Sequence, residues 1–155
     1  MERDIVIEID SVTEEVTLAC VAANALFAHY SLPKLLCYQM ELCVDEILNN
    51  IIEHDLHFVP GTRIRVQVHI ADRAARICIR YRSAQPELGP WKDRRDAPAG
   101  ALPERGFGCF LVAEIMDRVT VARDGDHNVF TLTKTLARPA VRKLGARRQS
   151  TEHES

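Results

Sequence analysis

Residues 41–55, which read ELCVDEILNNIIEHD, carry polar side chains in a pattern that suits proton transfer or metal binding. Glu46, Asn50 and Glu53 recur every three or four positions, so on a helix they share one face, with His54 at its edge. A carboxylate one turn before a carboxamide places a base beside a neutral oxygen donor. Hard cations such as Mg²⁺ take oxygen ligands of this kind. The same pattern also fits a solvated helix face without a function, and these residues alone favour that simpler interpretation.

A helix has to position these side chains, and the apolar residues among them predict one. Five of them recur at helical spacing: Met40, Val44, Ile47, Leu48 and Ile51. Pro33 is tolerated in the first turn of a helix. The helix is therefore expected to run from about Leu32 to about His54.

The composition is that of one globular domain. The chain has 155 residues, of which 46% are hydrophobic. No apolar run approaches the ~20 residues that cross a bilayer, so no membrane association is expected. The five cysteines show no CxxC spacing and sit within apolar patterns, as reduced thiols of a cytoplasmic protein do.

Charge is unevenly distributed along the chain. The stretch 137–155 has five Lys and Arg residues against two Glu, a net charge of about +3, which leaves about −5 on the rest. An acidic body argues against nucleic acid as a direct ligand. We expect one domain over residues 1–136, followed by a basic, flexible tail over residues 137–155.

The remaining patterns predict the order strand, helix, helix, strand, strand, loop, helix, strand, strand. Ser11 and Glu14 fit a capping box at the start of the first helix. Alternating residues predict strands at 5–9, 64–70, 77–81, 119–121 and 129–136. This order predicts an α+β fold, a two-layer sandwich in which three helices cover one face of a mixed, mostly antiparallel sheet.

A long loop separates the two halves of the chain. Residues 83–105 contain four prolines and two glycines, and loops of this length are commonly functional lids or disordered. Gly106 and Gly108 follow it, just before a helix expected to reach about Asp117. The N-terminus of a helix offers free amides to an anion, and glycine lets the backbone approach a phosphate closely.

Together these motifs are similar to those of a known family. Residues 46–54 look like its N box, residues 104–108 and the helix after them resemble its second glycine box, and residues 128–132 resemble its last strand. The chain thus resembles the anti-sigma-factor serine kinases of bacterial partner-switching systems. Their ATPase domain, of the GHKL or histidine-kinase-like type, is shared with histidine kinases and gyrase. The resemblance covers about Ile5 to Leu136.

The resemblance implies a role for each matching residue. Glu46 would be the general base that accepts the proton of a substrate serine, and Asn50 would bind the Mg²⁺ that bridges the phosphates of ATP. Gly106 and Gly108 would cradle phosphate, and Arg105 would face the γ-phosphate. The implied partners are an anti-anti-sigma (STAS-domain) protein that carries the serine, a sigma factor, and a second copy of the chain in a homodimer.

The chain departs from the family at the first glycine box, which reads Asp-x-Gly and receives the adenine. Tyr81 stands in the place of the Asp and Ser83 in the place of the Gly. Alternation along its strand puts Tyr81 on the core-facing side, where its ring would compete with the base. Two interpretations follow: a kinase that binds ATP by another route, or a binding module that sequesters its partner without ATP.

Overall fold

The computed structural model describes residues 2–86, 107–137 and 139–141. In chain order the elements are β1 (Arg3–Asp10), α1 (Thr13–His29), α2 (Lys34–Asn50), the π-helical segment η1 (Ile51–Asp55), β2 (Arg63–Ala71), β3 (Ala74–Arg82), α4 (Phe107–Ile115), β4 (Arg118–Asp124) and β5 (His127–Thr135). The predicted order of helices and strands is confirmed, apart from the boundaries. Most of the loop predicted at 83–105 and most of the tail predicted at 137–155 lie outside the described residues.

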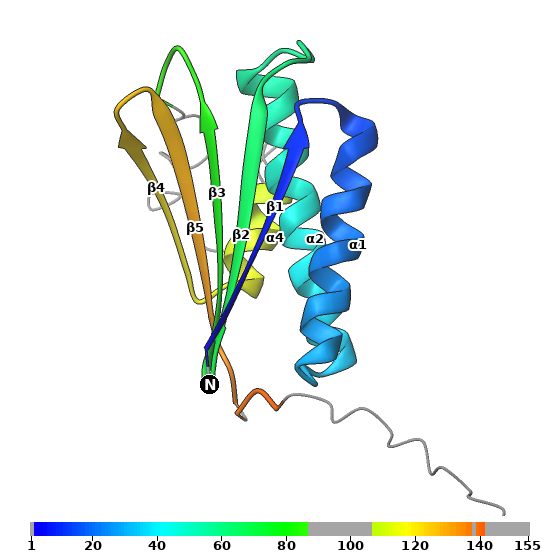
Figure 1. The fold of residues 1–155 in the computed structure, drawn as a ribbon. Helices are drawn as coiled ribbons and strands as arrows, with labels where there is room; N and C mark the ends of the chain where they lie inside the picture. The colour runs from blue at the N-terminus through cyan, green and yellow to red at the C-terminus, as the bar shows by residue number, and fades with distance from the viewer. Residues whose placement is uncertain (1, 87–106, 138, 142–155) are drawn as a thin grey trace, which may run out of the picture.

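The strands form one five-stranded sheet in the order β1-β2-β3-β5-β4 (Figure 1). Each neighbouring pair is antiparallel, so the sheet is antiparallel throughout rather than mixed. The reason is the connections. The helical hairpin α1–α2 returns the chain to the end of the sheet where β1 finished, and β5 separates β3 from β4, the two strands that run the same way.

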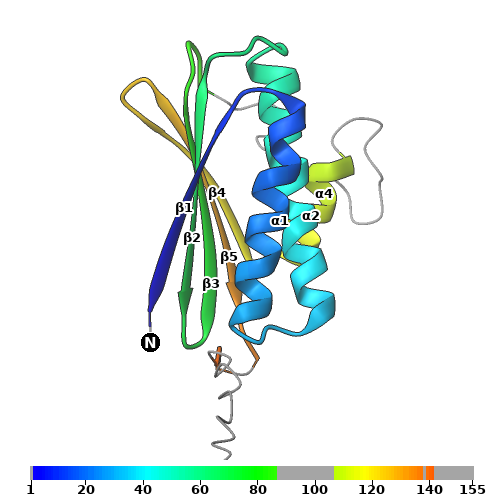
Figure 2. The same ribbon diagram turned by 45° about the vertical axis from the view of Figure 1, so that its right-hand side comes forward.

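The helices α1, α2 and α4 cover one face of this sheet, and the described residues leave its other face open (Figure 2). The α+β two-layer sandwich is therefore confirmed. Every second residue of β2 and β3 is buried under the helices: Ile64, Val66, Val68, Ile70, Ala75, Ile77, Ile79 and Tyr81. Burying these side chains stabilises the fold by roughly 1.5–3 kcal/mol for each large one.

The start of α1 differs from the predicted capping box. The N-cap is Val12, without a side-chain hydrogen bond. The hydroxyl of Ser11 is buried and donates instead to the carbonyl of Val59, 2.8 Å away, and Glu15 rather than Glu14 accepts from a backbone N–H, that of Asp10. Ser11 thus fastens the loop before β2 to the start of α1.

The long second helix changes its winding after Asn50. In η1 the amide of Leu56 donates to the carbonyl of Ile51 at 2.9 Å, a spacing of five residues instead of four. Ile51 and Ile52 are both 1% exposed, so the widened turn is anchored in the core. It decides where Asp55, the last residue of η1, points.

Residues 139–141 pack against the end of the domain opposite η1. The amides of Ala140 and Val141 donate to the carbonyls of Asp72 (2.8 Å) and Tyr30 (3.1 Å), which joins the β2–β3 turn to the α1–α2 turn. Among the described residues, no helix is long and apolar enough to cross a membrane.

Candidate functional site

Glu46 and Asn50 lie one turn apart on α2, each partly exposed, as the spacing predicts. Their neighbours Ile47 and Leu48 are buried and pack α2 into the core, between α1 and α4. Burial raises the pKa of Glu46, and the negative charge of Asp45 raises it further. A carboxylate with a raised pKa holds a proton more readily, which suits a general base.

The other polar residues of the motif, Glu53 and His54, lie after the end of α2. Glu53 lies in η1, is 54% exposed, and its carboxylate is 3.8 Å from the ring of the equally exposed His54. Glu53 and His54 therefore belong to the surface of η1.

The glycine motif is only partly within the described residues. Arg105 and Gly106 lie outside them. The helix predicted here is present as α4, but it begins at Phe107, so Gly108 is its second residue rather than a residue before it. The roles of Arg105, Gly106 and Gly108 toward phosphate stay predictions.

Tyr81 points into the core from β3, as predicted, and is completely buried. Its ring stacks on that of Phe130, with 6.4 Å between the ring centres. Its hydroxyl accepts a hydrogen bond of 3.2 Å from the side-chain amide of Asn128 on β5. The ring thus fills space in the core at the end of β3.

Ser83 follows β3 and is 4% exposed. Its hydroxyl is 2.9 Å from the Asp55 carboxylate and 2.8 Å from the carbonyl of Gln85. Its own amide donates to the carbonyl of Asp126, in the β4–β5 turn, at 3.0 Å. The Ser83 side chain and amide thus tie η1 to the sheet.

Asn128 connects these groups and was not predicted as a site residue. Its amide nitrogen lies 3.3 Å from Asp55 Oδ2 and 3.0 Å from the carbonyl of Gln85. Its oxygen accepts from Arg123 at 3.1 Å, and Arg123 also donates to the carbonyl of Ser83 at 2.9 Å. We call Asp55, Tyr81, Ser83 and Asn128 the base-end cluster, because the resemblance predicts the base beside Tyr81 and Ser83.

Sequence reasoning missed two members of the cluster, Asp55 and Asn128. The sequence does hold a signal for Asn128. Asn128 precedes Phe130 and Leu132 at alternate positions of the last strand, so it is a polar residue in an inward-facing register. Asp55 had no such signal, because its direction depends on the π-helical turn of η1.

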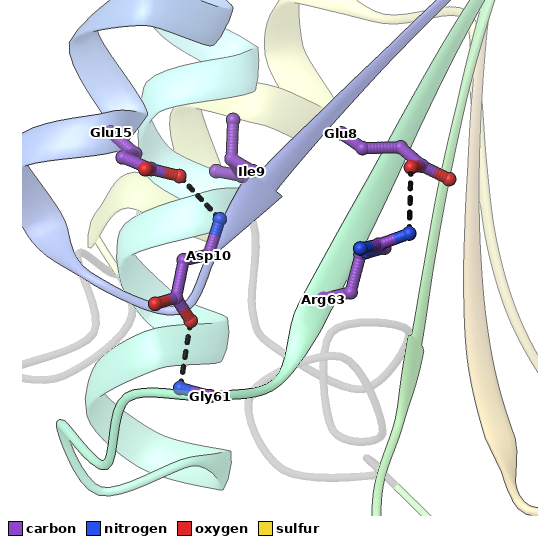
Figure 3. Close-up of a pocket in the computed structure, with 6 residues that line it drawn as sticks. All are labelled: Glu8, Ile9, Asp10, Glu15, Gly61 and Arg63. Carbon is purple, nitrogen blue, oxygen red and sulfur yellow. Dashed lines mark hydrogen bonds and ion pairs between the residues drawn. The ribbon is translucent and has the colours of Figure 1, made fainter.

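Two pockets lie away from these residues. One, of about 440 Å³, is formed at the start of α1 and is lined by Glu8, Ile9, Asp10, Glu15, Gly61 and Arg63 (Figure 3). Arg63 pairs with Glu8 at 3.2 Å, and the amide of Gly61 donates to Asp10 at 2.7 Å. Three carboxylates around one paired arginine repel phosphate, so this pocket does not suit a nucleotide. The other lies at the α1–α2 turn.

Comparison with known proteins agrees with the fold. The model of the family described as "Histidine kinase-like ATPase domain" matches residues 9–134. The chain belongs to this family. The match spans α1 to β5 and includes Glu46, Asn50 and the whole base-end cluster.

Curated relatives of the chain carry the name "Serine-protein kinase RsbW". The protein from Bacillus mycoides (strain KBAB4) is 25% identical over 137 residues, which cover 83% of this chain and 79% of that protein. The protein from Bacillus cereus (strain B4264) is 26% identical over the same length. These relatives align with most of the chain.

A solved structure shares the fold. It is the histidine kinase domain from the Erythrobacter litoralis EL346 blue-light activated histidine kinase, with a TM-score of 0.52 and 15% identity. The match covers 80% of this chain and 60% of that chain. It shows the arrangement of sheet and helices in a histidine kinase-like ATPase domain.

The side chains of Glu46 and Asn50 fit a magnesium ion. The partly exposed carboxamide of Asn50 offers the neutral oxygen that Mg²⁺ accepts as a ligand, and the carboxylate of Glu46 lies one turn away. When bound, Mg²⁺ would neutralise charge on the phosphate oxygens. At the other end of the site, Asp55 offers a carboxylate beside Ser83.

Proposed function

We propose that this protein is an anti-sigma factor and a protein-serine kinase of a partner-switching pathway. Its substrate is a serine of an anti-anti-sigma (STAS-type) protein, and its phosphate donor is ATP with Mg²⁺. The observation that carries the proposal is the pair of Glu46 and Asn50, one turn apart on α2 of a histidine kinase-like ATPase domain. Relatives named serine-protein kinases support it.

In this mechanism the chain positions and polarises the reactants. Glu46 accepts the proton of the substrate serine hydroxyl while the serine oxygen bonds to the γ-phosphorus. The bond between the γ-phosphorus and the bridging oxygen breaks, and ADP leaves. Asn50 would hold Mg²⁺, which would neutralise phosphate charge, and Arg105, Gly106 and Gly108 would hold the phosphates. Phosphoryl transfer depends mainly on such positioning and charge neutralisation.

Mg·ATP is expected to raise the melting temperature of the protein, because a ligand bound only to the native state stabilises it. With Tyr81 and Ser83 at the base end, we expect an affinity weaker than micromolar, which corresponds to about −8.2 kcal/mol. Asn50→Ala should weaken the magnesium-dependent shift. The matched control is Asn49→Ala, since Asn49 bonds Asp45 at 3.1 Å on the same helix. A wild-type protein that no Mg·nucleotide stabilises would contradict the kinase assignment.

The pH dependence of transfer should reflect the raised pKa of Glu46. Transfer falls as Glu46 becomes protonated. Because the pKa of Glu46 is raised, the rate should begin to fall at a higher pH than it would with a glutamate of ordinary pKa. Asp45→Asn removes the charge that adds to this shift, lowers the pKa of Glu46, and should move the limb to lower pH. A limb that stays in place in Asp45→Asn would show that another group sets it.

The proposal also names partners and a setting. The domain of residues 1–136 would act as a homodimer in the cytoplasm, with residues 137–155 as a basic tail, and would bind a sigma factor when it is not phosphorylating its antagonist. Affinity purification from the native cell, followed by mass spectrometry, should recover a STAS-domain protein and a sigma factor. Recovery of neither would count against the partner-switching role.

A second candidate function is an ATP-independent binding module, and one observation favours it. The base-end cluster fills the region beside the end of β3 with the chain's own side chains, of which Tyr81 is completely buried and Asn128 is 1% exposed. The resemblance predicts the base in this region, so these side chains would compete with it. Such a module would bind the same partner with equal affinity in the presence and absence of Mg·ATP. Isothermal titration of the purified partner under both conditions separates the two functions.

A further inference from the structure

The carboxylate of Asp55 lies beside the end of β3. On the strand, the resemblance puts Tyr81 at the family's acidic position. The carboxylate of Asp55, at the end of η1, lies 2.9 Å from the hydroxyl of Ser83, which follows Tyr81 by two residues. Of the side chains that hydrogen-bond Ser83 or Asn128 in the described part of the chain, only that of Asp55 is a carboxylate.

Rigid elements hold this carboxylate in place. The π-helical turn is closed by the Leu56-to-Ile51 hydrogen bond of 2.9 Å, and Ile51 and Ile52 anchor it in the core. On the sheet side, the Ser83 amide is bound to the carbonyl of Asp126 at 3.0 Å. A recognition group placed on such elements is more precise than one on a free loop.

The carboxylate also has capacity for a further donor. An ionised carboxylate offers about four lone-pair sites. Ser83 uses one site on Oδ1, and Asn128 uses one on Oδ2 over a longer distance of 3.3 Å. Asp55 is partly exposed, whereas Tyr81, Ser83 and Asn128 are buried, so within the cluster Asp55 is the member that an incoming ligand can reach.

We propose that Asp55 reads the base of the bound nucleotide, by accepting a hydrogen bond from the exocyclic amino group of adenine. In this proposal Asp55 replaces a carboxylate on β3 as the hydrogen-bond acceptor, and the ring of Tyr81 stays buried in the core. The inference rests on the proposed function, since it assumes that the site takes a nucleoside triphosphate. It makes Asp55 a specificity-determining residue.

The test compares Mg·ATP with Mg·ITP by isothermal titration. The two nucleotides differ at two adjacent atoms: in the base of ITP a carbonyl oxygen replaces the amino group of adenine, and N1 carries a hydrogen. The wild-type protein should bind Mg·ATP about tenfold more tightly, as one hydrogen bond to a charged group predicts. Asp55→Asn should remove or invert this preference, because its amide can donate to the carbonyl oxygen of inosine.

The matched control is Asp126→Asn. The Asp126 carboxylate lies in the β4–β5 turn and pairs with Arg82 at 3.0 Å and His127 at 2.7 Å, outside the base-end cluster. This variant should keep the wild-type preference. If Asp55→Asn does not fold, Ser83→Ala takes its place, because it removes the hydroxyl that orients the carboxylate and should reduce the preference several-fold.

The outcomes separate the inference from the proposed function. Binding of both nucleotides with equal affinity by the wild-type protein, or an unchanged preference in Asp55→Asn, would overturn the role of Asp55 and leave the kinase assignment standing. Binding of neither nucleotide would overturn both. A preference for Mg·ATP that is lost in Asp55→Asn and kept in Asp126→Asn would establish Asp55 as the group that reads the base.

Discussion

Replacing Glu46 with glutamine is expected to lower the rate of phosphate transfer by at least about 100-fold. A positioned general base contributes roughly 10²–10⁴-fold to a rate, and the glutamine amide has nearly the same shape but cannot accept a proton. The measurement is single-turnover transfer from Mg·ATP to the purified STAS-domain partner. An unchanged rate would remove Glu46 from the mechanism.

Two controls separate lost chemistry from lost structure. Glu46→Gln should keep the melting temperature and its shift with Mg·ATP, because Glu46 is partly exposed and the substitution removes a charge whose burial is unfavourable. Glu41→Gln is the matched variant on the same helix. Glu41 accepts from Asn24 of α1 at 2.6 Å, so this change alters a helix–helix contact and should leave the transfer rate within a few-fold of wild type.

The parts of the fold that the sequence predicts are those set by local periodicity. Alternation of Ile64, Val66 and Val68 predicts a strand buried on one face, and β2 has that pattern. Helical spacing likewise puts Glu46 and Asn50 on one side of α2, and the structure confirms it. In both cases the burial of an apolar stripe agrees with the intrinsic geometry of the element.

The parts that sequence reasoning missed depend on contacts between distant residues. Ser11 has a good local partner in the expected capping box, yet its hydroxyl bonds Val59, 48 residues away, because the loop before β2 folds over it. Asp55 reaches Ser83 only because η1 is wound more widely than an α-helix. Neither contact leaves a periodic trace in the sequence.

Truncating Tyr81 to alanine is expected to lower the free energy of unfolding by about 3–5 kcal/mol, the range for a large aromatic side chain removed from a core. Tyr81 is completely buried and stacks on Phe130, so the ring leaves a cavity that the sheet cannot easily close. Urea denaturation measures this loss, and the slope of the unfolding free energy against urea concentration should stay unchanged. Tyr38→Ala is the matched control: Tyr38 is 56% exposed on α2, and its truncation should cost within about 0.5 kcal/mol.

Tyr81→Phe divides that loss between the ring and the hydroxyl. The ring and its contact with Phe130 stay, and the amide of Asn128 keeps the carboxylate of Asp55 and the carbonyl of Gln85 as acceptors. The cost should therefore be about 1 kcal/mol, that of one hydrogen bond. A Tyr81→Ala variant as stable as wild type would show that the ring is not part of the core. If Tyr81→Ala instead loses stability but binds Mg·ATP more tightly than wild type, the ring both supports the fold and restricts the base, and the weak affinity expected of the native site follows from its packing.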